Sequence, residues 1–521
     1  MKKPKKNTVL KILCVVYAVI SFALLTLALL VRYAADWSVE EFGNIPFGQI
    51  VFTLQAPLTG SGSDVINRFI VGALKYILPV FIPCLIFYLL RFLPDIKPKF
   101  KIAGKEITVS IFKNKLFRFI RGAVMVFVAI LMFVNVTYAV DLLKIDDYLK
   151  AINTKTDIFD VCYVNASDVE ITAPEKKKNL IYIFCESIET SYSSKEYGGA
   201  LTDNLIPGLT ELALENECFS KDGEINGAMM TKNCTWTVAG MVAQTAGIPT
   251  NSPLGANSYG ADGEFLPGAV SIGEILEDNG YNNMLMFGSD KTFAYRGTYF
   301  ETHGNYIVSD YYSAIEDGNI SEDYYCWWGY EDRKLFEFAK EKITELAAED
   351  APFNFGLLTV DTHAPDGFAY DEDENIFDRQ IKNVTFRSDS QIAEFVQWIQ
   401  KQDFYEDTVI VIAGDHLSMS TSIDEIMSKE AEDDYERKVY VSIINSDTEN
   451  KRADENRVYT TMDLFPTTLA AMGFTIEGNR LGLGTDLYSG MDTLSEQLGF
   501  EYVNEAMEMS SDYYTQNILR Q

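Results

Sequence analysis

The pattern of hydrophobic positions divides the chain into two parts. Within the first 140 residues, long apolar runs occupy about residues 10–30, 69–93 and 122–140. Each run is close to the roughly 20 residues that a helix needs to cross the hydrocarbon core of a membrane. No small-residue cleavage site follows the first run, so we interpret it as an uncleaved span rather than a signal peptide. We therefore predict a transmembrane anchor of three helices over residues 1–140.

After residue 140 the apolar runs become short and alternate with amphipathic stretches. We predict buried strands at residues 179–185, 283–287, 353–360, 408–413 and 439–444. The 3.6-residue period of amphipathic helices occurs between them, at residues 207–215, 271–279, 331–348 and 390–401. This alternation is typical of an α/β fold with a mostly parallel sheet covered by helices on both faces. We expect one such domain over residues 179–521, joined to the anchor by a linker at residues 141–178 that packs on the domain.

The charges of the loops indicate how the anchor is oriented. Lysines precede the first span, and the loop between the second and third spans is rich in Lys and Arg. The loop between the first and second spans is acidic. Because positive loops stay in the cytoplasm, we expect a multi-pass membrane protein whose α/β domain lies outside the cytoplasm. A short apolar stretch at residues 47–58 of the acidic loop either lies in the membrane interface or has no role.

Composition narrows the possible functions. Residues 1–140 hold 17 Lys and Arg against 6 Asp and Glu, whereas the rest holds 27 against 69, for a total net charge of −31. A nucleic-acid partner is excluded, because that function needs a basic face for phosphate. Of the seven cysteines, the five outside the predicted spans have no paired spacing. We therefore predict no disulfide framework and at least one free thiol.

Ionisable side chains follow three of the predicted strands. They are Glu186 after residues 179–185, His363 shortly after residues 353–360, and Asp415 and His416 shortly after residues 408–413. In open α/β sheets the chemistry takes place at the carboxyl ends of the strands. Convergent carboxylates and imidazoles suit Zn²⁺ or Mn²⁺, and Mg²⁺ less well. Singly, each residue could be a helix cap or a solvated side chain, but their joint placement favours a metal site.

A second motif, NCTWT at residues 233–237, precedes an apolar helical stretch. A small nucleophilic side chain at a helix start is activated by the helix N-terminus and by an adjacent metal. Cys234 and Thr235 both qualify as the nucleophile. Alternatively, Thr235 or Thr237 only caps the helix. A further aromatic run at residues 324–329 either packs at the rim of the core or stacks on a sugar.

Four segments together resemble the membrane-anchored phosphoglycerol transferases of the sulfatase/alkaline-phosphatase superfamily. They are KKNLIYIFCESIETSY, NCTWTVAGMVAQTAGIP, TVDTHAPDGF and VIVIAGDHLSMS. The resemblance covers about residues 160–490 and is greater to the phosphoglycerol transferase I type than to lipoteichoic acid synthases. It implies a sulfatase-like sheet with the active site at the strand ends.

The resemblance also implies a reaction. Phosphoglycerol would pass from phosphatidylglycerol through a covalent enzyme intermediate to an extracellular glycan or glycolipid, with release of diacylglycerol. One divalent metal ion would assist, with Mn²⁺ preferred and Mg²⁺ or Zn²⁺ as alternatives. Other reactions on the same fold are phosphoethanolamine transfer and the hydrolysis of phosphate or sulfate esters.

Site residues are implied position by position. Glu186, Asp415 and His416 match the metal ligands of the relatives. His363 matches the histidine that contacts the substrate phosphate, and it is a candidate general acid. Arg296 falls where the relatives keep a basic residue for the phosphoglycerol group, although it could equally be a surface cation. The substrate-binding candidates also include two weaker ones nearby, Lys291 and His303.

The nucleophile position departs from the relatives, which carry a Thr there with Ser or Thr three residues later. By that spacing the equivalent residue is Cys234, with Thr237 three residues later. Sulfatases oxidise a cysteine at this position to formylglycine, but their C-x-P-S-R signature is replaced by CTWTV. Three hypotheses follow: Cys234 attacks as a thiolate, Thr235 supplies a hydroxyl, or the protein binds its ligand without turnover.

Overall fold

The computed structural model describes residues 6–43, 45–56, 63–90, 94–102, 105–108, 110, 114–221, 223–251, 263–372 and 375–519. The chain forms two compact units. The first, which we call the anchor unit, comprises Met1–Glu40 and Gly62–Asp146. The second, which we call the sheet unit, comprises Glu41–Ser61 and Asp147–Gln521. Residues 41–61 of the loop between the first two predicted spans therefore belong to the sheet unit.

The anchor unit is built on three long helices, α1 (Lys6–Phe42), α3 (Ser63–Leu89) and α4 (Lys115–Leu142). Each contains a stretch long and apolar enough to cross a membrane, which confirms the prediction of three candidate spans. Residues 91–93 of the second predicted span lie outside the described residues. Strands β1 (Lys99–Ile102) and β2 (Lys105–Thr108) form an antiparallel pair between α3 and α4.

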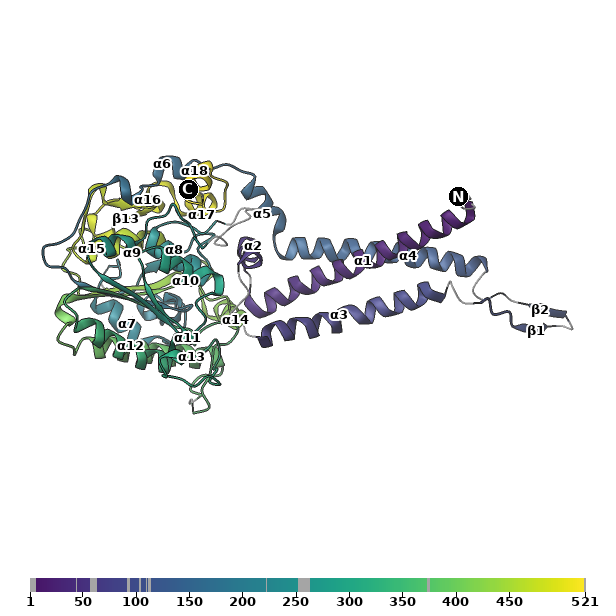
Figure 1. Ribbon diagram of the computed structural model, residues 1–521, viewed down its shortest axis with the longest axis horizontal. Helices are drawn as coiled ribbons and strands as arrows, with labels where there is room; N and C mark the ends of the chain where they lie inside the picture. Colours follow the sequence, from purple (N-terminus) through teal and green to yellow (C-terminus); the bar gives the residue numbers. More distant parts are fainter. Residues whose placement is uncertain are drawn as a thin grey trace. The chain divides into compact units, whose positions relative to one another are not determined.

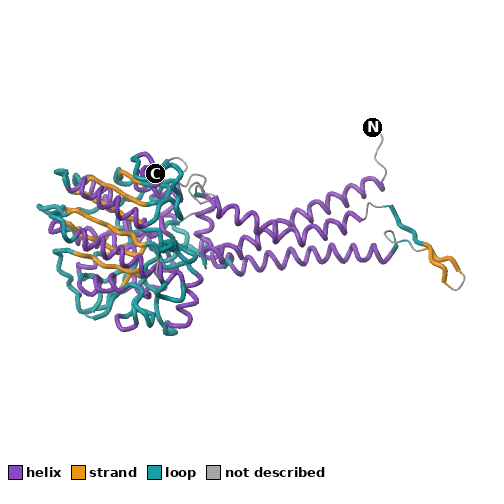
Figure 2. Tube along the Cα trace, turned by 90° about the horizontal axis from the view of Figure 1, so that it is seen from below, coloured by secondary structure: helices purple, strands orange, loops and turns teal. Residues whose placement is uncertain are grey.

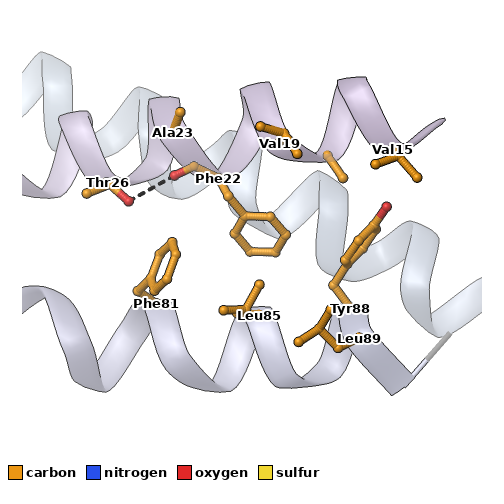
Figure 3. Close-up of a pocket in the computed structure, with 10 residues that line it drawn as sticks. Val15, Val19, Phe22, Ala23, Thr26, Phe81, Leu85, Tyr88 and Leu89 are labelled. Atoms are coloured by element: carbon orange, nitrogen blue, oxygen red, sulfur yellow. Dashed lines mark hydrogen bonds between the residues drawn. The ribbon is translucent and has the colours of Figure 1, made fainter. Parts of the chain in front are cut away.

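Helices α1 and α3 pack through apolar and aromatic side chains. The ring of Phe22 on α1 meets those of Phe81 and Tyr88 on α3 edge-on, at 5.8 and 5.6 Å between centroids. These rings line an apolar cavity of about 390 Å³ (Figure 3). The hydroxyl of Thr26, which also lines the cavity, donates to the carbonyl of Phe22 and is thus satisfied within its own helix.

A seven-stranded sheet forms the centre of the sheet unit (Figure 2). The strand order is β5 (Gly227–Ala228), β10 (Val439–Ile444), β9 (Thr408–Gly414), β4 (Asn179–Cys185), β8 (Phe353–Leu358), β6 (Asn282–Phe287) and β7 (Ile307–Ser309). From β9 to β7 all pairings are parallel, whereas β10 joins β9, and β5 joins β10, in antiparallel fashion. The predicted mostly parallel α/β sheet is thus confirmed.

Helices cover both faces of this sheet (Figure 1). Alternate residues of β4 point to opposite faces, with Tyr182 in one core cluster and Ile183 in the other. The Tyr182 face packs against α8 (Thr237–Ala246), α9 (Ile272–Asp278), α10 (Arg296–Thr302) and α15 (Leu464–Ala471). The other packs against α7 (Pro207–Glu215), α11 (Tyr311–Glu316), α12 (Asp332–Ala347), α13 (Gln380–Ile399) and α14 (Thr421–Glu430). Burial on both faces explains the continuous apolar strand runs.

The segment predicted as a linker is folded onto the sheet unit. It contains α5 (Ile145–Ile152), α6 (Ile158–Cys162) and β3 (Ile171–Thr172), which pairs with β11 (Thr475–Ile476). Phe159 is buried against Tyr514 at 5.1 Å between ring centroids. The C-terminal elements are β12 (Arg480–Leu481), β13 (Gly484–Thr485), α16 (Leu494–Leu498), α17 (Phe500–Ala506) and α18 (Asp512–Asn517). Six cysteines are free, which confirms the prediction of at least one free thiol: Cys84, Cys162, Cys185, Cys218, Cys234 and Cys326.

The short apolar stretch between the first two spans forms α2 (Phe47–Gln55), which packs within the sheet unit. Phe52 is only 1% exposed, and its ring lies 5.2 Å from that of Trp236. The hydroxyl of Tyr295 donates to the carbonyl of Gln55 at 3.2 Å. Gly48 is needed for this close approach, because a Cβ there would lie 2.8 Å from Oδ1 of Asn233. Residues 57 and 58 of the stretch lie outside the described residues.

The packing of α2 predicts that Phe52→Ala destabilises the sheet unit. Removal of a buried phenylalanine ring leaves a cavity and lowers the free energy of unfolding by about 3 kcal/mol. Thermal unfolding of the purified full-length protein measures this loss. Leu54→Ala on the same helix is the control, because Leu54 is 77% exposed and should change little. Equal effects of the two substitutions would show that α2 does not pack as described.

Candidate active site

Two carboxylates and one imidazole meet at the carboxyl ends of two neighbouring strands. Strands β4 and β9 are paired in parallel, with Cys185 opposite Gly414, so the next residues along each strand end lie side by side. Glu186, Asp415 and His416 offer ligand atoms that all lie within 4.8 Å of one another. Nε2 of His416 lies 3.4 Å from a Glu186 oxygen and 3.5 Å from an Asp415 oxygen. The structure therefore brings the three predicted metal ligands together, and all three are buried.

This cluster carries negative charge in a site with little water. Burial and the neighbouring charge of Glu186 raise the pKa of Asp415 to about 7. Burial acts to lower the pKa of His416, but the two carboxylates outweigh it and raise that pKa. Oδ1 of Asp415 accepts hydrogen bonds from the backbone of Ser187 and His416, whereas Oδ2 is buried without a hydrogen-bond partner. An orphaned carboxylate oxygen beside a second carboxylate and an imidazole fits a divalent cation.

His363 lies on the loop that follows β8, next to this cluster. The pKa of Glu186 is lowered overall. Burial is the largest effect and acts to raise this pKa, but the charges of His416 and then of His363 act to lower it. The hydroxyl of Thr362 donates to the backbone carbonyl of Glu186 and ties the two loops together. Nδ1 of His363 donates to the carbonyl of Ala364 at 2.9 Å, which assigns the proton to Nδ1 and leaves Nε2 for a substrate.

A threonine hydroxyl also reaches the cluster, from the first residue of α8. Oγ1 of Thr237 lies 3.4 Å from Oε2 of Glu186 and 3.4 Å from Nε2 of His416. The first N–H groups of α8 have no partner within the helix, so its positive end faces the site. The close approach requires Gly240, since a Cβ there would lie 2.0 Å from the carbonyl oxygen of Asp415.

The sequence motifs led us to weigh Thr237 only as a helix cap. The signal that could have singled it out is its place at the first turn of the apolar helical stretch, with a glycine three residues later. A helix start that packs closely on another loop must present its first side chains to that loop. The sequence motif does not locate the first residue of the helix to better than about three positions.

The two predicted nucleophiles have other surroundings. Cys234 is fully buried, and its sulfur accepts a hydrogen bond from the hydroxyl of Thr231 at 3.2 Å. Burial raises the pKa of the Cys234 thiol to about 12, so it stays protonated at neutral pH. Oγ1 of Thr235 is buried without a hydrogen-bond partner. The cluster of potential metal ligands that the described residues form does not include Cys234.

Arg296 is a buried cation rather than a surface one. It is 6% exposed, its guanidinium lies 3.9 Å from the ring centroid of Phe287, and it donates to the hydroxyl of Ser289 at 2.6 Å. Burial lowers the pKa of Arg296 to about 10, against the opposing effect of the Glu186 charge, so the side chain remains charged at neutral pH. Its Nε is buried without a hydrogen-bond partner. A buried cation with an unused donor suits an anionic ligand.

The two weaker candidates are engaged elsewhere. Nζ of Lys291 pairs with a carboxylate oxygen of Glu301 at 2.6 Å. Nε2 of His303 lies 2.8 Å from the carbonyl of Phe265, and Nδ1 lies 3.1 Å from Glu274. Both ring nitrogens of this buried histidine are therefore used within the fold. The structure does not bring either residue into the cluster.

Two buried carboxylates that the sequence did not single out hold the site loops in place. Asp332 accepts hydrogen bonds from the backbone N–H groups of Val360 and Asp361, just before His363, at 2.8 and 3.0 Å. Glu189 accepts from the N–H of Ser418, just after the metal-ligand pair, at 2.8 Å. Each carboxylate accepts hydrogen bonds from backbone N–H groups that would otherwise be buried without a hydrogen-bond partner.

Two curated relatives illustrate the similarity of this chain to known proteins. Phosphoglycerol transferase I of Xanthomonas campestris is 32% identical over 263 residues, which cover 49% of this chain and 36% of the relative. Phosphoglycerol transferase I of Shigella flexneri is 31% identical over 330 residues, which cover 61% of this chain and 40% of the relative. The chain thus spans well under half the length of the curated relatives it matches.

Solved structures with detectable similarity include a transferase and a synthase. Lipooligosaccharide phosphoethanolamine transferase A (EptA) from Neisseria meningitidis matches 87% of this chain and 84% of its own, with 14% identity and a TM-score of 0.49. Lipoteichoic acid synthase LtaP from Listeria monocytogenes matches 62% of this chain and 82% of its own, with 18% identity and a TM-score of 0.46.

A family model called Sulfatase matches residues 178–474. This range is more than half of the chain, and it includes Glu186, Thr237, Asp415 and His416. The chain belongs to the sulfatase family.

Proposed function

We propose that this protein is a metal-dependent phosphotransferase that moves phosphoglycerol from phosphatidylglycerol to an extracellular glycan or glycolipid and releases diacylglycerol. The observation that carries the proposal is the Thr237 hydroxyl, held 3.4 Å from both Glu186 and His416 at the positive end of a helix. The relatives named phosphoglycerol transferase I support phosphoglycerol as the transferred group. The three candidate spans support a lipid donor.

We assign the nucleophile to Thr237 rather than to Cys234 or Thr235. A nucleophile must lie beside the groups that ionise it, and the Thr237 hydroxyl contacts two of the three candidate ligands. A thiol at Cys234 would have to ionise against a pKa that burial raises to about 12. The sulfatase-type reaction is disfavoured as well, because this cysteine lacks the maturation signature.

We propose that Glu186, Asp415 and His416 hold one divalent ion, with Mn²⁺ as the first choice and Mg²⁺ or Zn²⁺ as alternatives. Two carboxylates and one imidazole form a ligand set that Mn²⁺ accepts readily. When bound, the ion lowers the pKa of a hydroxyl at the site and neutralises charge on the phosphate. We assign to Arg296 the binding of an anionic oxygen of the phosphoglycerol group, because its Nε has no partner within the fold.

The remaining steps are assigned to residues of this chain. Oγ1 of Thr237 loses its proton to solvent and attacks phosphorus, and the bond from phosphorus to the diacylglycerol oxygen breaks. That oxygen takes the Nε2 proton of His363, which enters this step as an imidazolium and keeps its Nδ1 proton on the carbonyl of Ala364. In the second half, the acceptor hydroxyl returns a proton to His363 and attacks the phosphoglyceryl group on Thr237. The threonine oxygen then leaves and is reprotonated from solvent.

The distribution of positive charge supports an extracytoplasmic sheet unit. The loop between the second and third spans carries 8 of the 17 Lys and Arg residues of residues 1–140, which favours a cytoplasmic position for this loop. Residues after the third span then lie on the opposite side, where glycan acceptors are found. A tether to the membrane raises the local concentration of a lipid donor, which offsets repulsion between an acidic domain and anionic lipid.

The donor assignment predicts which labelled lipid releases diacylglycerol. Purified full-length protein in detergent is incubated separately with fluorescent phosphatidylglycerol and phosphatidylethanolamine, each with Mn²⁺ or with chelator. We expect diacylglycerol from phosphatidylglycerol only, and only when metal is present. Release from phosphatidylethanolamine instead would replace the donor with phosphoethanolamine lipid, and release in chelator would exclude the metal role.

The nucleophile assignment predicts opposite results for two alanine substitutions. Thr237→Ala should lower the rate of diacylglycerol release at least about 10³-fold, because no other hydroxyl replaces the lost one. Cys234→Ala should keep the activity and lower the free energy of unfolding by about 1 kcal/mol, because it removes only a buried sulfur. Thermal unfolding checks that both variants fold. Loss of activity in folded Cys234→Ala, with Thr237→Ala still active, would contradict the assignment.

A further inference from the structure

A half-buried tryptophan stands directly beside His363. The ring of Trp328 lies 4.8 Å from the imidazole of His363, at an angle of 54° between the ring planes. On another side it lies 5.7 Å from the ring of Phe293, three residues before the buried Arg296. Trp328 thus lies between the proposed general acid and the turn that carries the proposed anion-binding residue.

Backbone contacts fix the turn that carries Trp328. Cys326 and Gly329 exchange two backbone hydrogen bonds, at 2.8 and 2.9 Å. Gly329 packs on the end of β6, where a Cβ would lie 2.0 Å from the carbonyl oxygen of Gly288. Nε1 of Trp327 donates to the carbonyl of Val360 on the loop after β8. The turn therefore bridges the two loops of the site, and its aromatic rings are held in place before a ligand arrives.

Aromatic side chains continue outward from this turn. The ring of Tyr311 lies 5.2 Å from that of Tyr312 and 5.7 Å from that of Tyr325. A Cβ on Gly329 would lie 3.1 Å from the Tyr311 ring, which joins these tyrosines to the tryptophan turn. Tyr312 and Tyr325 are each 54% exposed. We call Phe293, Trp328, Tyr311, Tyr312 and Tyr325 the aromatic strip.

The composition around the strip favours a neutral polar ligand. Exposed acidic residues flank the strip, namely Glu316, Asp317, Glu322 and Asp323. Carboxylates repel a second anionic lipid or phosphate, but they accept hydrogen bonds from sugar hydroxyls. Aromatic rings with polar ends offer an apolar face together with hydrogen-bonding groups, which matches the two kinds of surface on a sugar ring.

We propose that the aromatic strip binds a neutral glycan, the acceptor of the reaction, with Trp328 against the sugar that carries the attacking hydroxyl. This inference rests on the proposed function, in which the acceptor hydroxyl gives its proton to Nε2 of His363. A ring beside that imidazole contacts the sugar at the reacting end, and Tyr325 and Tyr312 contact sugars further along the glycan. The strip therefore sets acceptor specificity, whereas the Thr237 cluster carries out the transfer.

The test measures sugar binding and lipid cleavage separately. Full-length protein in detergent is titrated with neutral malto- and cello-oligosaccharides, and binding is followed by calorimetry. We expect wild type to bind at least one series, and Trp328→Ala and Tyr325→Ala each to weaken that binding about tenfold. Trp328→Phe should recover part of the loss, because it keeps an aromatic face. Tyr502→Ala, which removes an exposed tyrosine from α17, is the matched control and should bind like wild type.

Diacylglycerol release from phosphatidylglycerol is measured on the same samples. If wild type cleaves the lipid but binds no neutral oligosaccharide, or if the strip variants bind it as tightly as wild type, the strip is not the acceptor site and the proposed reaction stands. If the strip variants lose binding of short-chain phosphatidylglycerol instead, the strip is a lipid site and the inference is wrong. If sugar binding depends on the strip while no lipid is cleaved, the strip binds glycans and the proposed transfer fails.

Discussion

The active site depends on one constraint, the burial of two carboxylates beside an imidazole at the ends of adjacent parallel strands. The register of β4 against β9 places Glu186 next to Asp415, and no choice of side-chain conformation can separate these charges widely. Burial of a charge without compensation is costly, and it raises the pKa of Asp415 to about 7. One oxygen of Asp415 also lacks a hydrogen-bond donor. We propose that a divalent cation held by this cluster would compensate the charge of both carboxylates and supply a ligand-binding partner for the unpaired oxygen.

The surrounding structure makes this arrangement possible. Gly240 lets α8 approach the backbone of Asp415, and this approach brings the Thr237 hydroxyl to the cluster. Asp332 and Glu189 hold the two loops by accepting backbone N–H groups. Helix α2 adds support from a distant part of the sequence, because Phe52 packs against Trp236, the residue immediately before Thr237. The loop between two predicted spans thus helps to shape the nucleophile turn.

Much of this could be predicted from the sequence, because the signals were local. Buried parallel strands appear as short apolar runs, so the strands β4, β6, β8, β9 and β10 were predicted correctly. The three residues predicted as metal ligands lie close together at the ends of β4 and β9. Strands β5 and β7 were missed, since two or three residues at a sheet edge carry too little pattern. The docking of α2 and the surroundings of Trp328 depend on contacts between distant segments, which no local period reports. Helix α8 begins at Thr237, three residues after the Cys234 that the family spacing singled out, so the nucleophile that we propose differs from the two predicted ones.

The measurement that tests the central claim most directly is the position of the covalent intermediate. Full-length protein is mixed with phosphatidylglycerol and Mn²⁺ in the absence of acceptor, quenched with acid, digested and analysed by mass spectrometry. The account predicts a phosphoglyceryl group on Thr237 that disappears when a glycan acceptor is added before the quench. A phosphoglyceryl group on Cys234 or Thr235, with Thr237 unmodified, would contradict it.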